Sequence, residues 1–227
     1  MENKRYKPIA MLLQNLEMAL IFLIAFLFFT GFIWHQIEFS RPIVMKMTDT
    51  FLFFTNVVVL IFVLRKNYSI QLLIWSLLAF SITFMIEYMG VKTGKIFGDY
   101  YYGDTMLIQW GNVPVVIAFN WLILIMATNS ILMKVIGKKW LVPFLSPFLI
   151  LIFDFVMEPV AMKLDYWQWA NGTIPLQNYA AWFIIALFFS IILRFLNAIP
   201  DSKILRVYFF IQFLFFSLFR LEMLFFS

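Results

Sequence analysis

The sequence predicts an all-α, polytopic membrane protein with about seven transmembrane helices in one bundle. Of its 227 residues, 64% are hydrophobic, and the mean hydropathy is +0.92, whereas a soluble domain is about 45–50% apolar. The apolar residues form long runs, several of which approach or exceed the roughly 20 residues that a helix needs to cross a bilayer. Most of the Lys and Arg residues stand between these runs.

The seven runs are expected to cross the membrane in chain order. The first, residues 11–34, follows a basic tail, is longer than a signal-peptide core and lacks an A-x-A cleavage site, so we expect it to remain as an anchor. The second, residues 50–64, is the shortest and crosses only with help from Thr48 and a snorkelling Arg65. The others are 70–90, 113–133, 141–161, 177–197 and 204–226. We expect one domain, residues 1–227, with a motif-bearing core at about 80–185.

The distribution of Lys and Arg predicts the orientation. Eleven of them lie in the N-terminal tail and in the loops on the same side, at Lys4, Arg5, Lys7, Arg65, Lys66, Lys134, Lys138, Lys139, Arg194, Lys203 and Arg206. Six lie on the other side, at Arg41, Lys46, Lys92, Lys95, Lys163 and Arg220. Because basic residues favour the cytoplasmic side, we expect the N-terminus inside and the C-terminus outside. The net charge of +5 then reflects orientation and attraction to anionic lipid, and we expect no nucleic-acid partner.

Polar residues inside the predicted spans converge on the outer side of the membrane. At about 1.5 Å of rise per residue, the helix directions place seven of them in the outer parts of the third to sixth spans: Glu87, Asn120, Trp121, Asp154, Glu158, Asn178 and Trp182. Such clustering predicts one shared cavity that opens toward the outer leaflet.

Asp154 and Glu158 are the most informative members of this cluster, because they lie four residues apart on one face of an otherwise apolar helix. An ionised side chain near the bilayer centre costs about 2.5–3.5 kcal/mol, so such groups usually mark chemistry or transport. Two neighbouring carboxyl groups do not easily ionise together, and a neutral acid beside a carboxylate suits proton donation and removal. The alternative is a polar clamp, in which Asp154 bonds to Asn120 or a tyrosine only to hold helices together.

Two long connections lie on the same side. Tyr88–Asn112 combines glycines, among them Gly90, Gly94, Gly98 and Gly103, with Tyr100, and Met162–Pro175 contains Trp167 and Trp169. Flexible backbone and aromatic side chains suit a lid or the rim of a cavity, although Trp and Tyr also collect at membrane interfaces without any role in a site.

The composition argues against a metal or a cofactor. The chain has no cysteine, and its one histidine, His35, cannot form a multi-histidine site. The acidic residues are more widely spaced than a magnesium–diphosphate site requires. The last predicted span, 204–226, has no lysine in its interior for a retinal Schiff base.

Several ordered motifs occur within the core of the chain. They are Glu87 to Tyr100, Pro114 with Trp121, Asp154 to Ala161, Trp167-Gln168-Trp169, and Pro175 with Asn178 and Trp182. Together they resemble the motifs of the bacterial and archaeal carotenoid biosynthesis membrane proteins, a family that includes the carotenoid 1,2-hydratases.

The resemblance implies an integral protein of the bacterial inner membrane that adds water to the terminal double bond of an acyclic carotenoid end without a cofactor. Lycopene or gamma-carotene is the implied substrate, with membrane lipid and other carotenoid enzymes as neighbours. Asp154 or Glu158 would donate the proton, and the other, or Glu87, would orient the water. Aromatic faces would stabilise the cation, and the expected substrate-binding residues are Trp121, Asn120, Tyr100, Trp167, Trp169, Asn178 and Trp182.

Three other functions stay open on the sequence alone. A lycopene-type cyclase would use the same carbocation and end in ring closure. A proton-coupled transporter would use the buried acids as a relay, but its paired broken helices are missing, since Pro143, Pro147 and Pro159 all fall in one span. A carotenoid-binding scaffold would need no acid at all.

Overall fold

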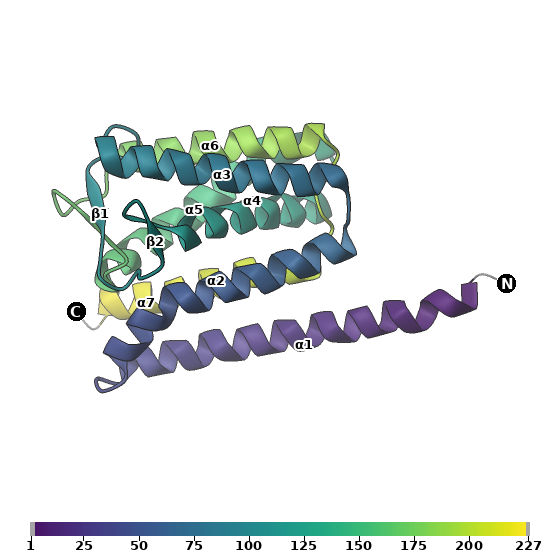
Figure 1. Ribbon diagram of the computed structural model, residues 1–227, viewed down its shortest axis with the longest axis horizontal. Coiled ribbons are helices and arrows are strands. Elements are labelled where there is room, and N and C mark those ends of the chain that lie inside the picture. Colours follow the sequence, from purple (N-terminus) through teal and green to yellow (C-terminus); the bar gives the residue numbers. More distant parts are fainter. Residues whose placement is uncertain (1–2, 226–227) are drawn as a thin grey trace.

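The computed structural model describes residues 3–225, with side chains from residue 11 onward, and shows seven long helices with short strands at one end (Figure 1). The helices are α1 (Asn3–Gln36), α2 (Arg41–Lys66), α3 (Ile70–Thr93), α4 (Val115–Val135), α5 (Val142–Lys163), α6 (Leu176–Phe195) and α7 (Lys203–Phe225), and a single 3₁₀ turn, η1 (Lys139–Leu141), precedes α5. All seven are long and apolar enough to cross a bilayer. The chain is therefore an all-α integral membrane protein, as the sequence predicts.

The second helix departs most from its predicted bounds. Instead of the shortest span, 50–64, α2 is a helix of 26 residues, and the shortest is α6 with 20. Pro42 lies in the first turn, where a missing N–H costs nothing. The predicted span began after Asp49, because a charged residue interrupts the apolar run. In the structure Asp49 is buried inside α2, where its Oδ2 accepts a 2.6 Å hydrogen bond from the backbone N–H of Ile108, in the connection between α3 and α4. The expectation of a short second span was therefore wrong.

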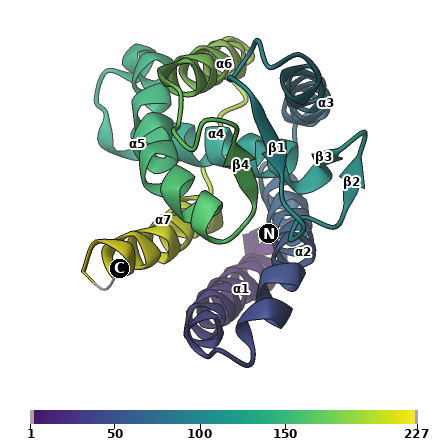
Figure 2. The ribbon, with the colours of Figure 1, turned by 90° about the vertical axis from the view of Figure 1, so that its left-hand side faces the viewer.

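Helix α4 forms the centre of the bundle. It packs against α2, α3, α5, α6 and α7, and its buried residues lie on all of its faces (Figure 2). Helix α1 lies at the periphery and packs against α2 and α7. A helix that is apolar all round is expected in such a central position.

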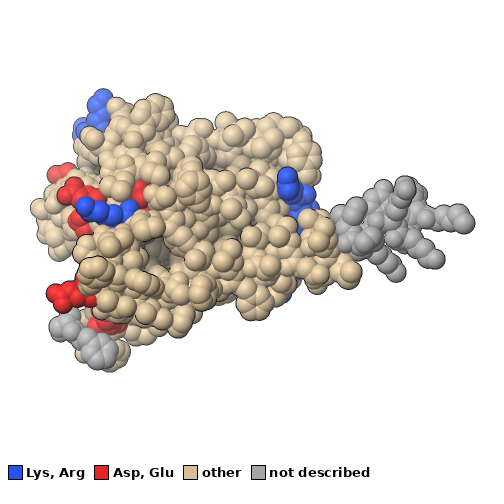
Figure 3. Space-filling view, turned by 60° about the horizontal axis from the view of Figure 1, so that its bottom comes forward, with Lys and Arg blue, Asp and Glu red and all other residues tan. Residues whose placement is uncertain are grey.

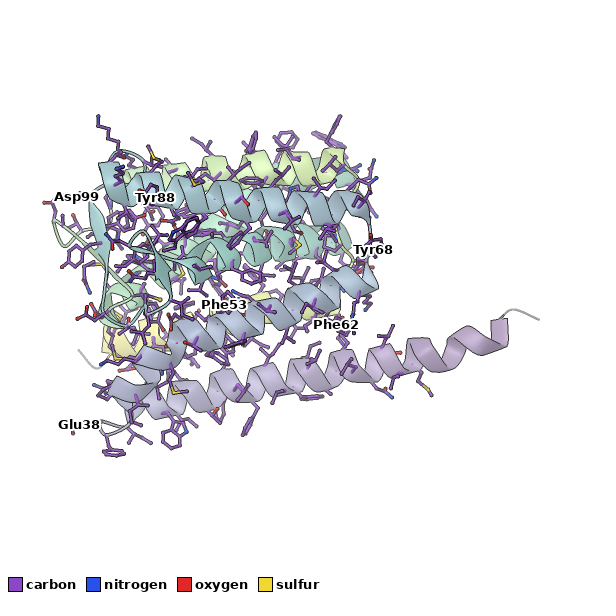
Figure 4. All side chains as sticks on the ribbon, viewed as in Figure 1. Glu38, Phe53, Phe62, Tyr68, Tyr88 and Asp99 are labelled. Carbon is purple, nitrogen blue, oxygen red and sulfur yellow. The ribbon has the colours of Figure 1, made fainter. Side chains whose placement is uncertain are left out.

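The outer surface matches a lipid environment. Large apolar side chains such as Phe22, Phe54 and Phe155 are exposed along the helices. In Figure 3 the charged side chains gather at the two ends of the molecule and leave an uncharged surface between them. In Figure 4 the acidic residues Glu38 and Asp99 lie at the end that carries the strands, and Tyr68 marks the opposite end.

The two long connections form paired strands, which the sequence did not predict. β1 (Tyr100–Tyr102) pairs antiparallel with β4 (Trp167–Trp169), so that Tyr100 lies opposite Trp169 and Tyr102 opposite Trp167 (Figure 2). A second pair, β2 (Gln109–Trp110) and β3 (Val113–Pro114), leads into α4. Aromatic residues favour extended backbone. The paired strands β1 and β4 form an aromatic cover over this end of the bundle, and their pairing fixes its register.

Gly98 allows the connection from α3 to β1 to pass close to α6. Its φ is +116°, and a Cβ atom there would lie 2.7 Å from Cγ of Pro175. We expect Gly98→Ala to destabilise the protein by about 1–3 kcal/mol, the usual cost of a residue held in such a backbone region, measured by thermal unfolding in detergent. Gly137→Ala is the control, since nothing lies within 4 Å of that Cβ position; equal stability of the two variants would contradict the prediction.

Candidate functional site

A cavity lies under the aromatic cover, between the ends of four helices and the β1–β4 pair. The volume that the centre of a water molecule can occupy in it is about 20 Å³. One water needs about 10–15 Å³ of such volume, so the cavity can hold a water. None of the described residues that line it is basic. They are Glu87, Phe97, Tyr100, Tyr102, Ile117, Trp121, Asp154, Met157, Glu158, Trp167, Trp169, Asn178 and Trp182.

Glu158 is held by three N–H donors. Its Oε2 accepts hydrogen bonds from the indole nitrogens of Trp167 at 3.0 Å and Trp169 at 2.9 Å, and its Oε1 accepts one from the amide of Asn178 at 2.8 Å. The side chain is on α5, the two tryptophans on β4 and the asparagine on the first turn of α6. Three N–H donors replace the water that an ionised carboxyl group would otherwise need.

Asp154, one turn earlier on α5, has a different environment. It is fully buried, and its Oδ2 lies 3.3 Å from the amide nitrogen of Asn178. Its Oδ1 is buried and has no hydrogen-bond partner among the described residues. The clamp to Asn120 or to a tyrosine, considered as an alternative for this residue, is not formed by the described side chains. A buried carboxyl oxygen without a partner is costly in a structural role.

Glu87, in the last two turns of α3, accepts hydrogen bonds at Oε2 from the hydroxyl groups of Tyr100 at 2.5 Å and Tyr102 at 2.9 Å. Burial, followed by the adjacent Glu87 carboxyl group, raises the pKa of both tyrosines well above the usual value. The two hydroxyl groups therefore stay protonated and act as donors. The pairing of β1 with β4 brings these donors and the tryptophans of Glu158 to one place.

Aromatic rings form the remaining wall. Trp121 of α4 stacks on Trp182 of α6 with ring centroids 3.6 Å apart, and Phe97 stacks on the same indole at 5.0 Å. Gly90 makes room for this arrangement, because a Cβ atom at that position of α3 would lie 2.6 Å from the Phe97 ring. The faces of such rings attract positive charge.

The structure brings nine of the ten predicted site residues to this cavity, and the exception is Asn120. Asn120 is half-buried and does not line the cavity, although its neighbour Trp121 does. Successive residues point about 100° apart on a helix of 3.6 residues per turn, and Asn120 lies on the side of α4 turned away from the cavity. Sequence reasoning missed Phe97, Tyr102, Ile117 and Met157. Tyr102 could have been found, because residues two positions apart in an extended segment point to the same face, and Tyr102 is two positions after Tyr100.

Fold and site together define a class of protein: an integral membrane protein whose helices enclose three carboxyl groups beneath an aromatic cover. The sequence profile of the carotenoid biosynthesis protein family matches residues 47–225, and the chain belongs to this family. Its role is therefore in carotenoid biosynthesis. The match runs from α2 to α7, well beyond the 80–185 window that the motifs indicated. No curated protein and no solved structure matches the chain significantly.

Proposed function

We propose that the protein is a carotenoid 1,2-hydratase that adds water to the terminal double bond of an acyclic carotenoid end. The observation that carries the proposal is the contrast between two acids on one helix: Asp154 has an unpartnered oxygen, while Glu158 is held by three N–H donors. An acid that keeps its proton beside a stabilised carboxylate is what protonation of an isolated alkene requires.

Asp154 is the proton donor in this proposal. An ionised carboxylate in its place would be buried with only one long hydrogen bond, and such burial disfavours charge strongly. Its proton passes to the less substituted carbon of the terminal double bond. The electron pair of that bond forms the new C–H bond, and the carbon that bears the two methyl groups becomes a tertiary cation.

Glu158 and the aromatic wall stabilise this cation. The carboxylate supplies the compensating negative charge, and the rings of Trp121, Trp167 and Trp169 line the same cavity. Cation–π contacts of this kind contribute about 0.5–2 kcal/mol each, more when water is excluded.

Glu87 captures the proton of the attacking water. Both tyrosine donors reach its Oε2, which leaves Oε1 to accept a hydrogen bond from a water in the cavity. The water oxygen bonds to the cationic carbon, its proton passes to Glu87, and a tertiary alcohol remains. Return of that proton to Asp154 through the cavity restores the starting state, so the net change is the addition of one water and no cofactor takes part.

The site must open to admit its substrate, because a cavity of about 20 Å³ holds a water but not the branched end of a polyene. The cover is the part that can move. Besides the β1–β4 pair, its backbone hydrogen bonds include Gly103 to Tyr166 and Ala170 to Asp99, each 3.0 Å long. Opening would therefore disturb the donors of Glu158 and Glu87, and closure would restore them around the bound end.

The test is expression in cells that make lycopene or gamma-carotene, followed by mass analysis of the pigments. A product heavier by one water supports the proposal. An unchanged pigment would contradict it. A more cyclised product of unchanged mass would indicate the cyclase instead, which uses the same cation but ends in ring closure.

Two of the earlier alternatives can be tested alongside. A proton-coupled transporter should give proton flux in liposomes, and a scaffold should keep carotenoid binding when both Asp154 and Glu158 are neutralised. Membership of a biosynthetic family favours the enzyme over both.

The topology that accompanies this function is also a proposal. We propose one domain over residues 1–227, in a bacterial inner membrane beside other carotenoid enzymes, with the N-terminus inside. The helix bounds support this topology, because successive loops fall at opposite ends of the bundle, as the count of Lys and Arg on the two sides assumes. The side chains of Lys4, Arg5 and Lys7 lie outside the described residues. Reporter fusions to the loop between α4 and α5 and to the loop between α5 and α6 should report opposite sides.

Glu158→Gln should destabilise the protein as well as slow the reaction. The new amide oxygen can replace Oε2 and accept from both indoles, but the amide NH₂ then faces the NH₂ of Asn178. A buried donor left without an acceptor costs about 1–3 kcal/mol, which thermal unfolding in detergent should detect. Glu38→Gln is the matched control, because it makes the same change at an exposed residue on the same end of the bundle (Figure 4). A Glu158→Gln variant as stable as the parent would mean that Asn178 turns over without cost.

A further inference from the structure

A second and larger cavity lies outside the acid cluster. Its volume is about 210 Å³, and α1, α2 and α7 form its walls together with Tyr166, the residue before β4. Phe28, Phe51 and Phe215 are among its apolar lining residues, and it shares no lining residue with the cavity of the three acids. It is thus a separate site on the same end of the bundle.

Two polar side chains interrupt this apolar lining. His35 is 4% exposed and Tyr166 is 2% exposed, and neither Nε2 of the histidine nor the tyrosine hydroxyl has a hydrogen-bond partner among the described residues. Thr48 lies near the tyrosine hydroxyl, but its own hydroxyl is bonded to the carbonyl of Val44 at 3.0 Å and forms no hydrogen bond with Tyr166. Buried polar groups in proteins are nearly always paired, so two orphans in one cavity call for a ligand.

The chemistry of the two orphans is complementary. Nδ1 of His35 lies 2.7 Å from the carbonyl oxygen of Gly31, and because a carbonyl can only accept, Nδ1 carries the proton. In the neutral ring Nε2 is then an acceptor. Tyr166 is a donor, since burial raises the pKa of its hydroxyl above the usual value. The site therefore offers one acceptor and one donor.

An alcohol matches this pair better than other oxygen groups. Its O–H can donate to His35 and its oxygen can accept from Tyr166, whereas a carbonyl has no proton for the histidine. A carboxylate would bring a charge into a cavity whose lining includes no Lys or Arg. A single water would leave most of the apolar volume empty. A dry cavity of about 150 Å³ accommodates benzene in another protein, so this one has room for a branched chain end.

We propose that the cavity between α1, α2 and α7 binds the alcohol-bearing end of an isoprenoid chain, with His35 and Tyr166 as its hydrogen-bonding partners. Family membership makes isoprenoid chains the apolar molecules at hand. The alcohol has two possible sources, the tertiary alcohol of a hydrated carotenoid or the primary alcohol of a membrane polyprenol. The first source rests on the proposed hydration, whereas the alcohol site itself does not.

The test uses three branched ten-carbon compounds with matched skeletons: a tertiary alcohol, its primary-alcohol isomer and the parent alkane. Protein purified from carotenoid-free cells is titrated with each, and affinity is obtained from the shift of the unfolding temperature with concentration. We expect an alcohol to bind about 10-fold more tightly than the alkane, the ratio that two ordinary hydrogen bonds supply. A preference for the tertiary isomer assigns the site to a hydrated carotenoid, and a preference for the primary isomer assigns it to a polyprenol.

His35→Phe and Tyr166→Phe should each reduce the advantage of the alcohol over the alkane while leaving the alkane's own effect unchanged. Tyr208→Phe is the matched control, because it removes a buried hydroxyl that bonds to Asn56 at 2.9 Å and does not line the cavity. Equal binding of alcohol and alkane would overturn the proposal, as would an advantage that survives in both variants. Absence of hydration by the parent protein with the alcohol preference intact would overturn the proposed function and keep this site.

Discussion

Replacing Asp154 with asparagine should lower the rate of hydration by about 10²–10⁴-fold, the contribution usual for a general acid. The amide has almost the same shape and can still contact Asn178, but it has no acidic proton to give to the alkene. Protonation is the first step of the proposed reaction, so formation of the cation and capture of water should both be lost with it. Substrate recovered after incubation in heavy water should therefore carry no deuterium at its chain end.

The matched control is Asp201→Asn. Asp201 lies between α6 and α7 at the opposite end of the bundle, where its side chain is 64% exposed and pairs with Lys134 and Arg206. Those two cations hold the pKa of this carboxyl group below its usual value, so it stays ionised at neutral pH. An Asp154→Asn variant that is folded and hydrates as fast as the Asp201→Asn control would remove Asp154 from the chemistry and leave it a structural residue.

The helices could be predicted from the sequence because a bilayer demands long apolar runs, and the runs are legible without knowledge of the fold. Prediction failed where polar residues are satisfied from elsewhere. Asp49 ends the apolar run of α2, but the backbone of Ile108 solvates it from a loop about 60 residues later in the chain. Local sequence contains no signal of such a distant partner, so the predicted span was too short.

The site could be predicted for a similar reason and with a similar limit. Acids inside an apolar helix are conspicuous, and helix direction gives their depth, which is why Glu87, Asp154 and Glu158 were grouped correctly before any contact was known. Depth does not give rotation, and Asn120 turned out to lie beside the wall rather than in it. The β1–β4 pairing was out of reach, because it joins two three-residue strands with two helices, α4 and α5, between them in the chain, and no repeated pattern marks either strand.

That pairing links access to catalysis. The same two strands that close the cavity also supply the hydroxyl donors of Glu87 and the indole donors of Glu158. When the cover is displaced, both acids lose donors that stabilise their charge, and the contrast with Asp154 weakens. In the proposed reaction the acid and the carboxylates would be correctly paired only with the cover closed, which would limit exposure of the cation to stray water.

Replacing Glu87 with glutamine should separate protonation from water capture. The amide oxygen can still accept from Tyr100 and Tyr102, so the cover keeps its hydrogen bonds, but no base remains for the attacking water. Alcohol formation should fall by about 10²–10⁴-fold, while Asp154 continues to protonate the alkene. In heavy water the cation then returns a proton to Asp154 and leaves deuterium in the recovered substrate.

The decisive quantity is the ratio of deuterium exchange to hydration, because loss of folded protein lowers both rates together and leaves the ratio unchanged. Glu17→Gln is the matched control: Glu17 is a buried acid at the other end of the bundle, paired with Lys66 at 2.6 Å and with the backbone of Ile204 at 3.1 Å. It should lose stability and keep the parent ratio. If Glu87→Gln instead lowers exchange and hydration by one common factor, and by more than the loss of folded protein accounts for, Glu87 acts before or during protonation, and the water must find its base at Glu158.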